Sequence, residues 1–102
     1  MVTANGMRPV HPGEILREEF LIPFNLSARA LAANLHISAS RISGVIRERR
    51  AITADAALRL ARYFGTSAEF WLGLQSDYDM KVTQAESGAK IEQDVVPMEQ
   101  AA

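Results

Sequence analysis

The sequence predicts an all-α domain, and three stretches of the chain carry that prediction. Residues 27–50 contain two short helical segments separated by a tight break. Residues 54–64 repeat apolar side chains at i, i+3, i+4 and i+7, which is the spacing of one face of an α-helix. Residues 67–86 place large apolar side chains at the same spacing. Each stretch also starts at or just after a serine or threonine, residues that commonly cap helix N-termini.

Length and composition limit the chain to one domain. With 102 residues and 48% hydrophobic content, it is long enough to bury a single modest core. The absence of cysteine excludes a disulfide framework and a thiolate metal site. The N-terminus has no apolar signal segment, and no apolar run approaches the length of a membrane span. We therefore expect a cytoplasmic protein that does not contact membranes.

The first helix is predicted to begin within residues 11–14. Proline at the first helical position loses no N–H group that the helix needs, and Glu14 interacts favourably with the positive end of the helix dipole. The helix should stop near residues 21–22, because the position before Pro23 disfavours helical backbone. Residues 1–10, which lack periodicity, are expected to form a mobile arm.

Residues 27–50 predict a helix-turn-helix. Ser27 and Ser38 are suited to cap two short helices, and His36 lies at the turn between them. The left-handed backbone of such a turn costs histidine less than it costs a β-branched residue. The apolar residues shared by the two helices are Leu31, Leu35, Ile37, Ile42, Val45 and Ile46. This motif lays its second helix in the major groove of DNA, although helix pairs also occur in small helical proteins that bind no DNA.

The outward face of the second helix is small, polar and basic, as a groove-facing surface should be. The candidate DNA-binding residues are Ser38, Ala39, Ser40, Arg41, Ser43, Gly44, Arg47, Arg49 and Arg50. Ser40, Arg41 and Ser43 are placed for base readout, and Gly44 would let the DNA backbone approach closely. The three later arginines are placed for phosphates or base edges. A dimer would bind an inverted repeat in double-stranded DNA.

The helix that follows Ser67 carries more large apolar surface than a small core needs. Trp71 and Phe70 can close the core, and part of the stripe can meet a second subunit. The candidate dimer contacts are Phe70, Trp71, Leu72, Leu74 and Tyr78, with Leu72, Leu74 and Tyr78 the better placed. The folded domain is thus expected to span residues 11–86 and to form a homodimer.

Charge is divided unevenly along the chain. Residues 8–65 carry nine arginines against five acids, a net charge of +4. Residues 66–102 carry two lysines against seven acids, a net charge of −5, so the whole chain has a net charge of −1. The basic part suits phosphate contact, and the acidic part suits a second role.

Residues 87–102 are expected to form a weakly ordered acidic tail, since they lack aromatic residues and sustained periodicity. Ile91, Val95, Val96 and Met98 are apolar enough to fold onto a partner, and a simply solvated tail is the alternative.

Catalytic motifs are missing from the sequence. His11 and His36 lie in separate breaks without carboxylates at ligand spacing, so no metal site is expected. The chain also lacks a Walker A or dinucleotide-binding pattern. We therefore expect a protein that is not an enzyme and uses no cofactor or small-molecule substrate.

Residues 7–80 resemble the HigA antitoxins, a branch of the XRE-type helix-turn-helix proteins. The resemblance is carried by His11-Pro12-Gly13-Glu14-Ile15-Leu16, Leu31-Ala32, Ile37-Ser38, Arg49-Arg50, Ile52-Thr53, Ala57-Leu58-Arg59-Leu60-Ala61, Phe64-Gly65-Thr66-Ser67, Phe70-Trp71-Leu72, Leu74-Gln75 and Tyr78-Asp79. The combination of His11-Pro12-Gly13-Glu14-Ile15-Leu16 with Phe70-Trp71-Leu72 and Leu74-Gln75 is much more specific than the helix-turn-helix alone. One departure is Met80-Lys81, where relatives often carry Leu-Trp.

The resemblance implies a five-helix, lambda-repressor-like domain that forms a homodimer. It also implies repression of the chain's own operon and neutralisation of a HigB toxin, which is similar to RelE-type mRNA endonucleases. Such a toxin must be basic to hold RNA, so the acidic part of this chain would be complementary to it. The alternatives are a stand-alone XRE-type repressor without a toxin partner, and acids that only maintain solubility.

Overall fold

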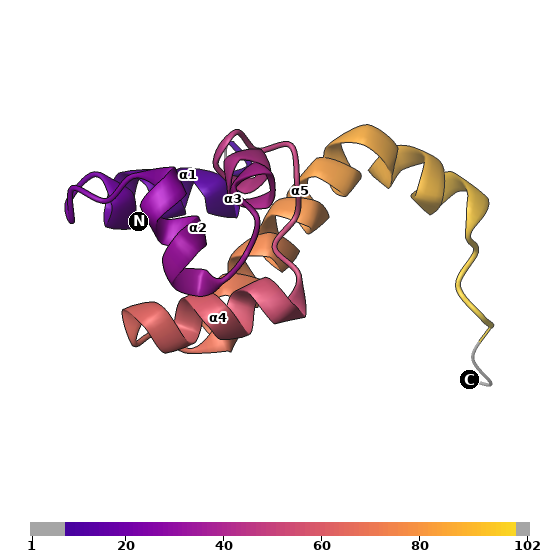
Figure 1. Ribbon diagram of the computed structural model, residues 1–102. Coiled ribbons are helices and arrows are strands. Elements are labelled where there is room, and N and C mark those ends of the chain that lie inside the picture. Colours follow the sequence, from indigo (N-terminus) through magenta and orange to yellow (C-terminus); the bar gives the residue numbers. More distant parts are fainter. Residues whose placement is uncertain (1–7, 100–102) are drawn as a thin grey trace.

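The computed structural model describes residues 8–99, and within them the chain folds into helices joined by short connections (Figure 1). The helices are α1 (Pro12–Ile15), η1 (Leu16–Leu21), α2 (Ala28–Leu35), α3 (Ala39–Ile46), α4 (Ala54–Phe64) and α5 (Ala68–Asp94). The backbone stays helical between α1 and η1, so these two form one continuous helix. The five-helix, all-α prediction is confirmed.

The first helix changes its winding halfway along. Its second part, η1, is a π-helix, in which Ile22 N–H donates to the Arg17 carbonyl five residues earlier at 3.0 Å. The helix ends before Pro23, where the sequence places its stop. The predicted arm is described only from Arg8 onward, and residues 1–7 lie outside the described part of the chain.

Side-chain caps fix where the other helices begin. The hydroxyls of Ser27, Ser38, Thr53 and Ser67 each accept a hydrogen bond from the backbone N–H three residues later. These bonds satisfy N–H groups that a helix start otherwise leaves unpaired. The local sequence signal therefore places the helix starts correctly.

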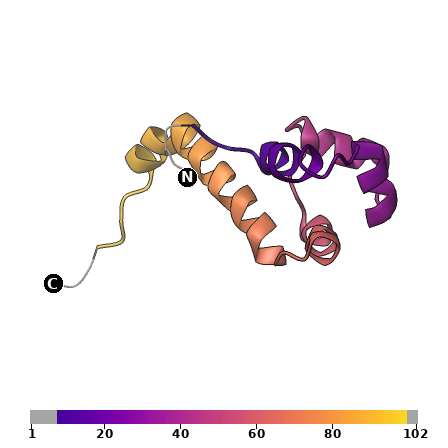
Figure 2. The ribbon, with the colours of Figure 1, turned by 90° about the vertical axis from the view of Figure 1, so that its left-hand side faces the viewer.

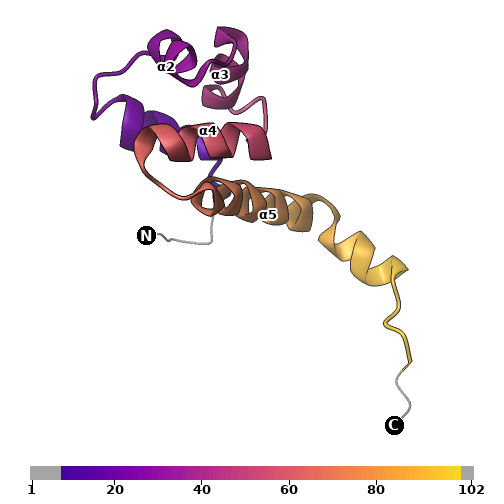
Figure 3. The ribbon, with the colours of Figure 1, turned by 60° about the horizontal axis from the view of Figure 1, so that its bottom comes forward.

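The core lies between the helix-turn-helix and the last two helices. Its buried apolar side chains are Leu16, Leu21, Leu31, Ala32, Leu35, Ile42, Val45, Ile52, Ala56, Ala57, Leu60 and Trp71. Ala32 and Ala57 are small side chains in this core, and α2 contacts both α3 and α4. Figure 3 shows α4 lying between the α2–α3 pair and α5. This arrangement supports the helix-turn-helix from behind.

Helix α5 is longer than the sequence indicates. It continues to Asp94, so the predicted helix end at residue 86 is wrong, and only residues 95–99 of the described tail lack helical structure. Figures 2 and 3 show its later part bending and extending away from the other helices. Ser87 and Gly88 belong to this later part, and serine and glycine pairs are a known cause of helix kinks.

The projecting helix makes the chain elongated. Its radius of gyration is 16.8 Å, whereas a compact domain of this length would have about 13 Å. Within residues 8–99, no helix has both the length and the apolarity needed to span a membrane. The later part of α5 offers surface that the other described residues do not cover.

Candidate nucleic-acid interface

The turn before α3 has the conformation that a helix-turn-helix needs. His36 ends α2 with φ 57° and ψ 44°, which is left-handed backbone, and its N–H bonds to carbonyls of α2. Ser38 then caps α3 by accepting from Arg41 N–H at 3.3 Å. Ile42 and Val45 fix the inner face of α3 in the core. The outer face is thereby held toward solvent.

The small polar residues of that outer face differ in exposure. Ser38, Ala39 and Ser40 are exposed, whereas Ser43 is half-buried. The three exposed residues lie at the start of α3. The N-terminal end of a recognition helix is the part that contacts base edges in this motif.

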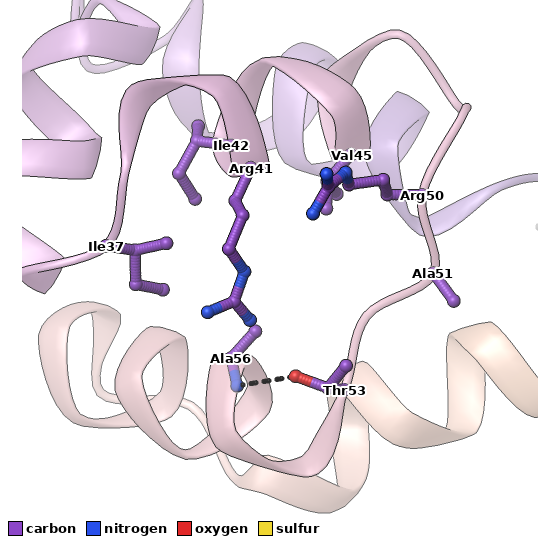
Figure 4. A pocket seen from close by; sticks show the side chains of 8 residues that line it. All are labelled: Ile37, Arg41, Ile42, Val45, Arg50, Ala51, Thr53 and Ala56. Atoms are coloured by element: carbon purple, nitrogen blue, oxygen red, sulfur yellow. Dashed lines mark hydrogen bonds between the residues drawn. The ribbon is translucent and has the colours of Figure 1, made fainter.

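Arg41 and Arg50 line a shallow pocket of about 270 Å³ between α3 and the start of α4 (Figure 4). The stem of Arg50 lies against Gly44, and a Cβ added at Gly44 would lie only 2.8 Å from Arg50 Cδ. The space beside Gly44 is therefore filled from within the chain. This packing gives the small residue a role within the fold, and the close approach of DNA at Gly44 stays a prediction.

The arginine cluster follows α3 instead of continuing it. Helix α3 ends at Ile46, and the N–H groups of Arg49 and Arg50 both donate to the Gly44 carbonyl, at 2.8 and 3.1 Å. Glu48 adopts a left-handed conformation with φ 64°, which turns the loop. Arg47, Arg49 and Arg50 remain exposed at this end of the helix. Three cations at the edge of a polar helix face suit a phosphate backbone.

Not every arginine of the basic part is available to DNA. The Arg59 guanidinium, on α4, donates to the Leu35 carbonyl at 2.9 Å and to the His36 carbonyl at 3.4 Å. It also pairs with Asp55 at 2.9 Å. Arg59 therefore satisfies carbonyls at the end of α2 and stabilises the turn. The sequence alone does not reveal this role, because no local pattern links residues 24 positions apart.

His11, the residue that caps α1, packs against α5. The His11 ring is buried, and its Nδ1 accepts a hydrogen bond from Gly13 N–H at 2.9 Å. The ring lies edge-on to the Tyr78 ring, with 4.8 Å between the two ring centroids. Burial lowers the pKa of His11 from its ordinary value, so its neutral form is favoured. Hydrogen bonding to Arg8 lowers the pKa of the Glu14 carboxyl.

The predicted dimer residues do not share one exposed surface. Trp71 is completely buried in the core of the single chain, and its Nε1 donates to Thr66 Oγ1 at 2.8 Å. Its assignment as a dimer contact is therefore wrong. Leu74 and Tyr78 are half-buried, while Phe70 and Leu72 are 40% and 37% exposed. Only the last two present substantial free area.

Buried polar groups near this site are paired. Gln75 lies among the apolar residues of α5, where its Oε1 accepts from Ile52 N–H at 2.7 Å and its Nε2 donates to Asp79 at 3.0 Å. In the described part of the chain, no group of three His, Asp or Glu side chains is arranged to hold a metal ion.

The comparisons with known proteins agree with this geometry. A helix-turn-helix family model matches residues 16–71. Virulence-associated protein I of Dichelobacter nodosus is 59% identical over 80 residues, covering 78% of this chain and 74% of the relative. Antitoxin HigA-1 of Vibrio cholerae is 37% identical over 73 residues, covering 72% and 69%.

A solved structure extends the likeness to nearly the whole chain. The Pseudomonas aeruginosa antitoxin HigA with the higBA promoter superposes with a TM-score of 0.87 at 50% identity, covering 90% of this chain and all of that one. This chain therefore belongs to the helix-turn-helix family, and within it to the HigA antitoxins of XRE type.

Proposed function

We propose that this chain is a homodimeric repressor that binds DNA upstream of its own gene and also neutralises a HigB-type, RelE-like mRNA endonuclease. The observation that carries the DNA part is the exposed polar start of α3 followed by three exposed arginines. The related HigA with its promoter supports the same use of this face. The chain would act in the cytoplasm, by binding and not by catalysis.

The phosphate part of this proposal can be tested through salt dependence. Arg49→Gln should weaken binding to a duplex from upstream of the gene, and the slope of log affinity against log salt should fall by about 0.9 for each lost phosphate contact. Arg62→Gln, on the exposed side of α4, is the matched control for losing one positive charge. Fluorescence anisotropy at several salt concentrations measures both. An unchanged slope for Arg49→Gln would contradict its contact with phosphate.

The later half of α5 is the surface through which we propose that the homodimer forms. An open groove of about 730 Å³ is lined there by Met80, Thr83, Gln84, Gly88, Ala89, Ile91 and Glu92. Met80 and Ile91 are 58% and 49% exposed, and the glycine and alanine beside them let another helix approach closely. A short helix end is only marginally stable in water by itself. Packing against a second copy would stabilise it.

The toxin part of the proposal depends on charge. Glu86, Glu92, Asp94 and Glu99 are exposed, and of these Asp94 pairs with Lys90 at 2.8 Å within the helix. Within the described residues, Glu86 and Glu99 have no ion pair and lie outside the groove lining, so they can meet a basic protein, and complementary charge speeds encounter. The likeness to antitoxin HigA-1 supports such a partner. A repressor without a toxin would use these acids for solubility alone.

Co-expression with the product of the neighbouring gene tests the toxin part. The wild-type chain should retain that product in a pull-down, and the double variant Glu86→Gln, Glu99→Gln should retain less of it while binding the upstream duplex normally. Glutamine keeps the size and helix preference of glutamate. If the wild type binds DNA but retains no neighbouring product, the stand-alone repressor is the correct function.

A further inference from the structure

Arg17 of η1 contacts the C-terminal end of α3, 29 residues later in the chain. Its Nη1 donates to the Ile46 carbonyl at 2.9 Å, and its Nε donates to Glu18 at 3.0 Å. Its Nη2 lies 3.7 Å from the carboxylate of Glu48, in the loop after α3. One guanidinium therefore joins the first helix, the last residue of α3 and the turn that follows it.

These contacts meet a need that helix ends have. The last carbonyls of a helix lack partners within the helix, and a cation near them interacts favourably with the negative end of the dipole. Ile46 is the last residue of α3, so Arg17 supplies that partner. The planar guanidinium directs several donors at once, which lets it bind a carbonyl and two carboxylates together.

A second contact between α1 and α3 lies at Val45, the residue before Ile46, and further limits the movement of α3 relative to the first helix. A Cβ at Gly13 would overlap the Val45 carbonyl, so α1 and α3 touch backbone to backbone there. The first helix thus holds α3 at two successive carbonyls, Val45 and Ile46. Arg47, Arg49 and Arg50 follow directly, so a shift at this point would displace the basic loop together with the end of α3.

We propose that Arg17 is a positioning residue, which sets the orientation of α3 and its arginine loop for sequence-specific DNA binding without contacting phosphate itself. This inference rests on the proposed operator binding. Because the side chain is already committed to partners within the chain, its loss should change how well the correct sequence fits. Its loss should leave the number of neutralised phosphates unchanged.

The test compares Arg17→Gln, Arg17→Lys and the control Arg62→Gln in the full-length chain. Each is titrated against the upstream duplex and a scrambled duplex of equal length, at several salt concentrations. Arg17→Gln should bind the upstream duplex at least tenfold more weakly than Arg62→Gln does. The two variants should bind the scrambled duplex with equal affinity, and the salt slope of Arg17→Gln should equal that of the wild type. Arg17→Lys retains the charge but loses the fork of donors, so it should also bind the upstream duplex more weakly than wild type.

Three outcomes would overturn the inference. One is Arg17→Gln binding the upstream duplex as well as Arg62→Gln does. Another is a salt slope reduced by about 0.9, which would make Arg17 a phosphate contact. The third is wild-type affinity in Arg17→Lys, which would reduce its role to charge. Circular dichroism at the titration temperature confirms that each variant is folded. A wild-type chain that does not prefer the upstream duplex would instead refute the proposed function.

Discussion

Gly13 is the residue whose replacement should cost the fold most for the smallest chemical change. The added methyl group of Gly13→Ala would overlap the Val45 carbonyl, so α1 and α3 would have to separate. Forcing atoms into a packed contact typically costs about 1–3 kcal/mol of unfolding free energy, and a backbone clash falls at the upper end. Urea unfolding measures this loss.

The control for this change is another glycine. A Cβ at Gly73, within α5, meets no atom within 4 Å. Gly73→Ala should therefore gain about 0.5–1 kcal/mol, because glycine loses more freedom than alanine when a helix forms. Equal stability of the two alanine variants would show that α1 and α3 separate freely.

His11 should make stability depend on pH. Its pKa is lowered by burial in the folded chain, although Glu48 and Asp79 act in the opposite direction. The unfolded chain, with the ordinary pKa of 6.5, then binds the proton more readily. The free energy of unfolding should be highest above that pH and fall as the solution becomes more acidic.

His11→Asn separates this effect from other groups. Asparagine retains an acceptor for the Gly13 N–H but does not titrate, so the variant should lose the pH dependence between about pH 7.5 and 5.5. Chemical unfolding at several pH values in that window provides the comparison. If the free energy of unfolding changes equally with pH in the wild type and in His11→Asn, protonation of His11 does not contribute to the pH dependence of stability.

At the scale of single elements, the cap of α3 can be separated from its DNA-facing surface. Ser38→Ala removes the hydroxyl that accepts from Arg41 N–H, and it should cost about 1 kcal/mol of unfolding free energy. Ser40 is exposed on the outer face. Ser40→Ala should change stability by less than about 0.5 kcal/mol but weaken operator binding. Thermal unfolding measures the effect of each variant on stability, and anisotropy measures its effect on DNA binding. If neither variant weakens DNA binding, α3 does not lie in the groove.

Helix starts could be predicted from the sequence because their causes are local. Ser27, Ser38 and Thr53 lie within three residues of the N–H groups they cap. The left-handed turn at His36 also follows from one residue and its neighbours. The end of α5 could not be predicted, because residues 87–94 lack aromatic residues and sustained apolar periodicity and yet continue the helix.

At the scale of the whole molecule, assembly should depend on the later half of α5. The pair Met80→Glu and Ile91→Glu places charge in the proposed interface and should shift the proposed dimer to monomer. Both side chains are exposed in the single chain, so helix content should persist. Leu58→Glu, at a leucine that is 63% exposed on α4, is the matched control and should remain dimeric. Light scattering reports the mass; a persistent dimer would move the interface toward Phe70 and Leu72.

The division of labour among the arginines also emerges only at this scale. Counting them along the chain predicts a basic part for DNA, and the exposed Arg47 and Arg49 agree with that. Arg17 and Arg59 instead bind carbonyls at the ends of α3 and α2, across 29 and 24 residues of sequence. Such distant partners follow from tertiary packing, and no local pattern reveals them.

The uncovered part of α5 has a consequence for the lifetime of the chain in a cell. Segments with few buried contacts open more often than the core, and a protease needs such an opening to cleave. Assembly that covers this segment would suppress the opening in proportion to how tightly it binds. Free chains would then be degraded faster than assembled ones, so the amount of repressor present would follow the supply of its partners.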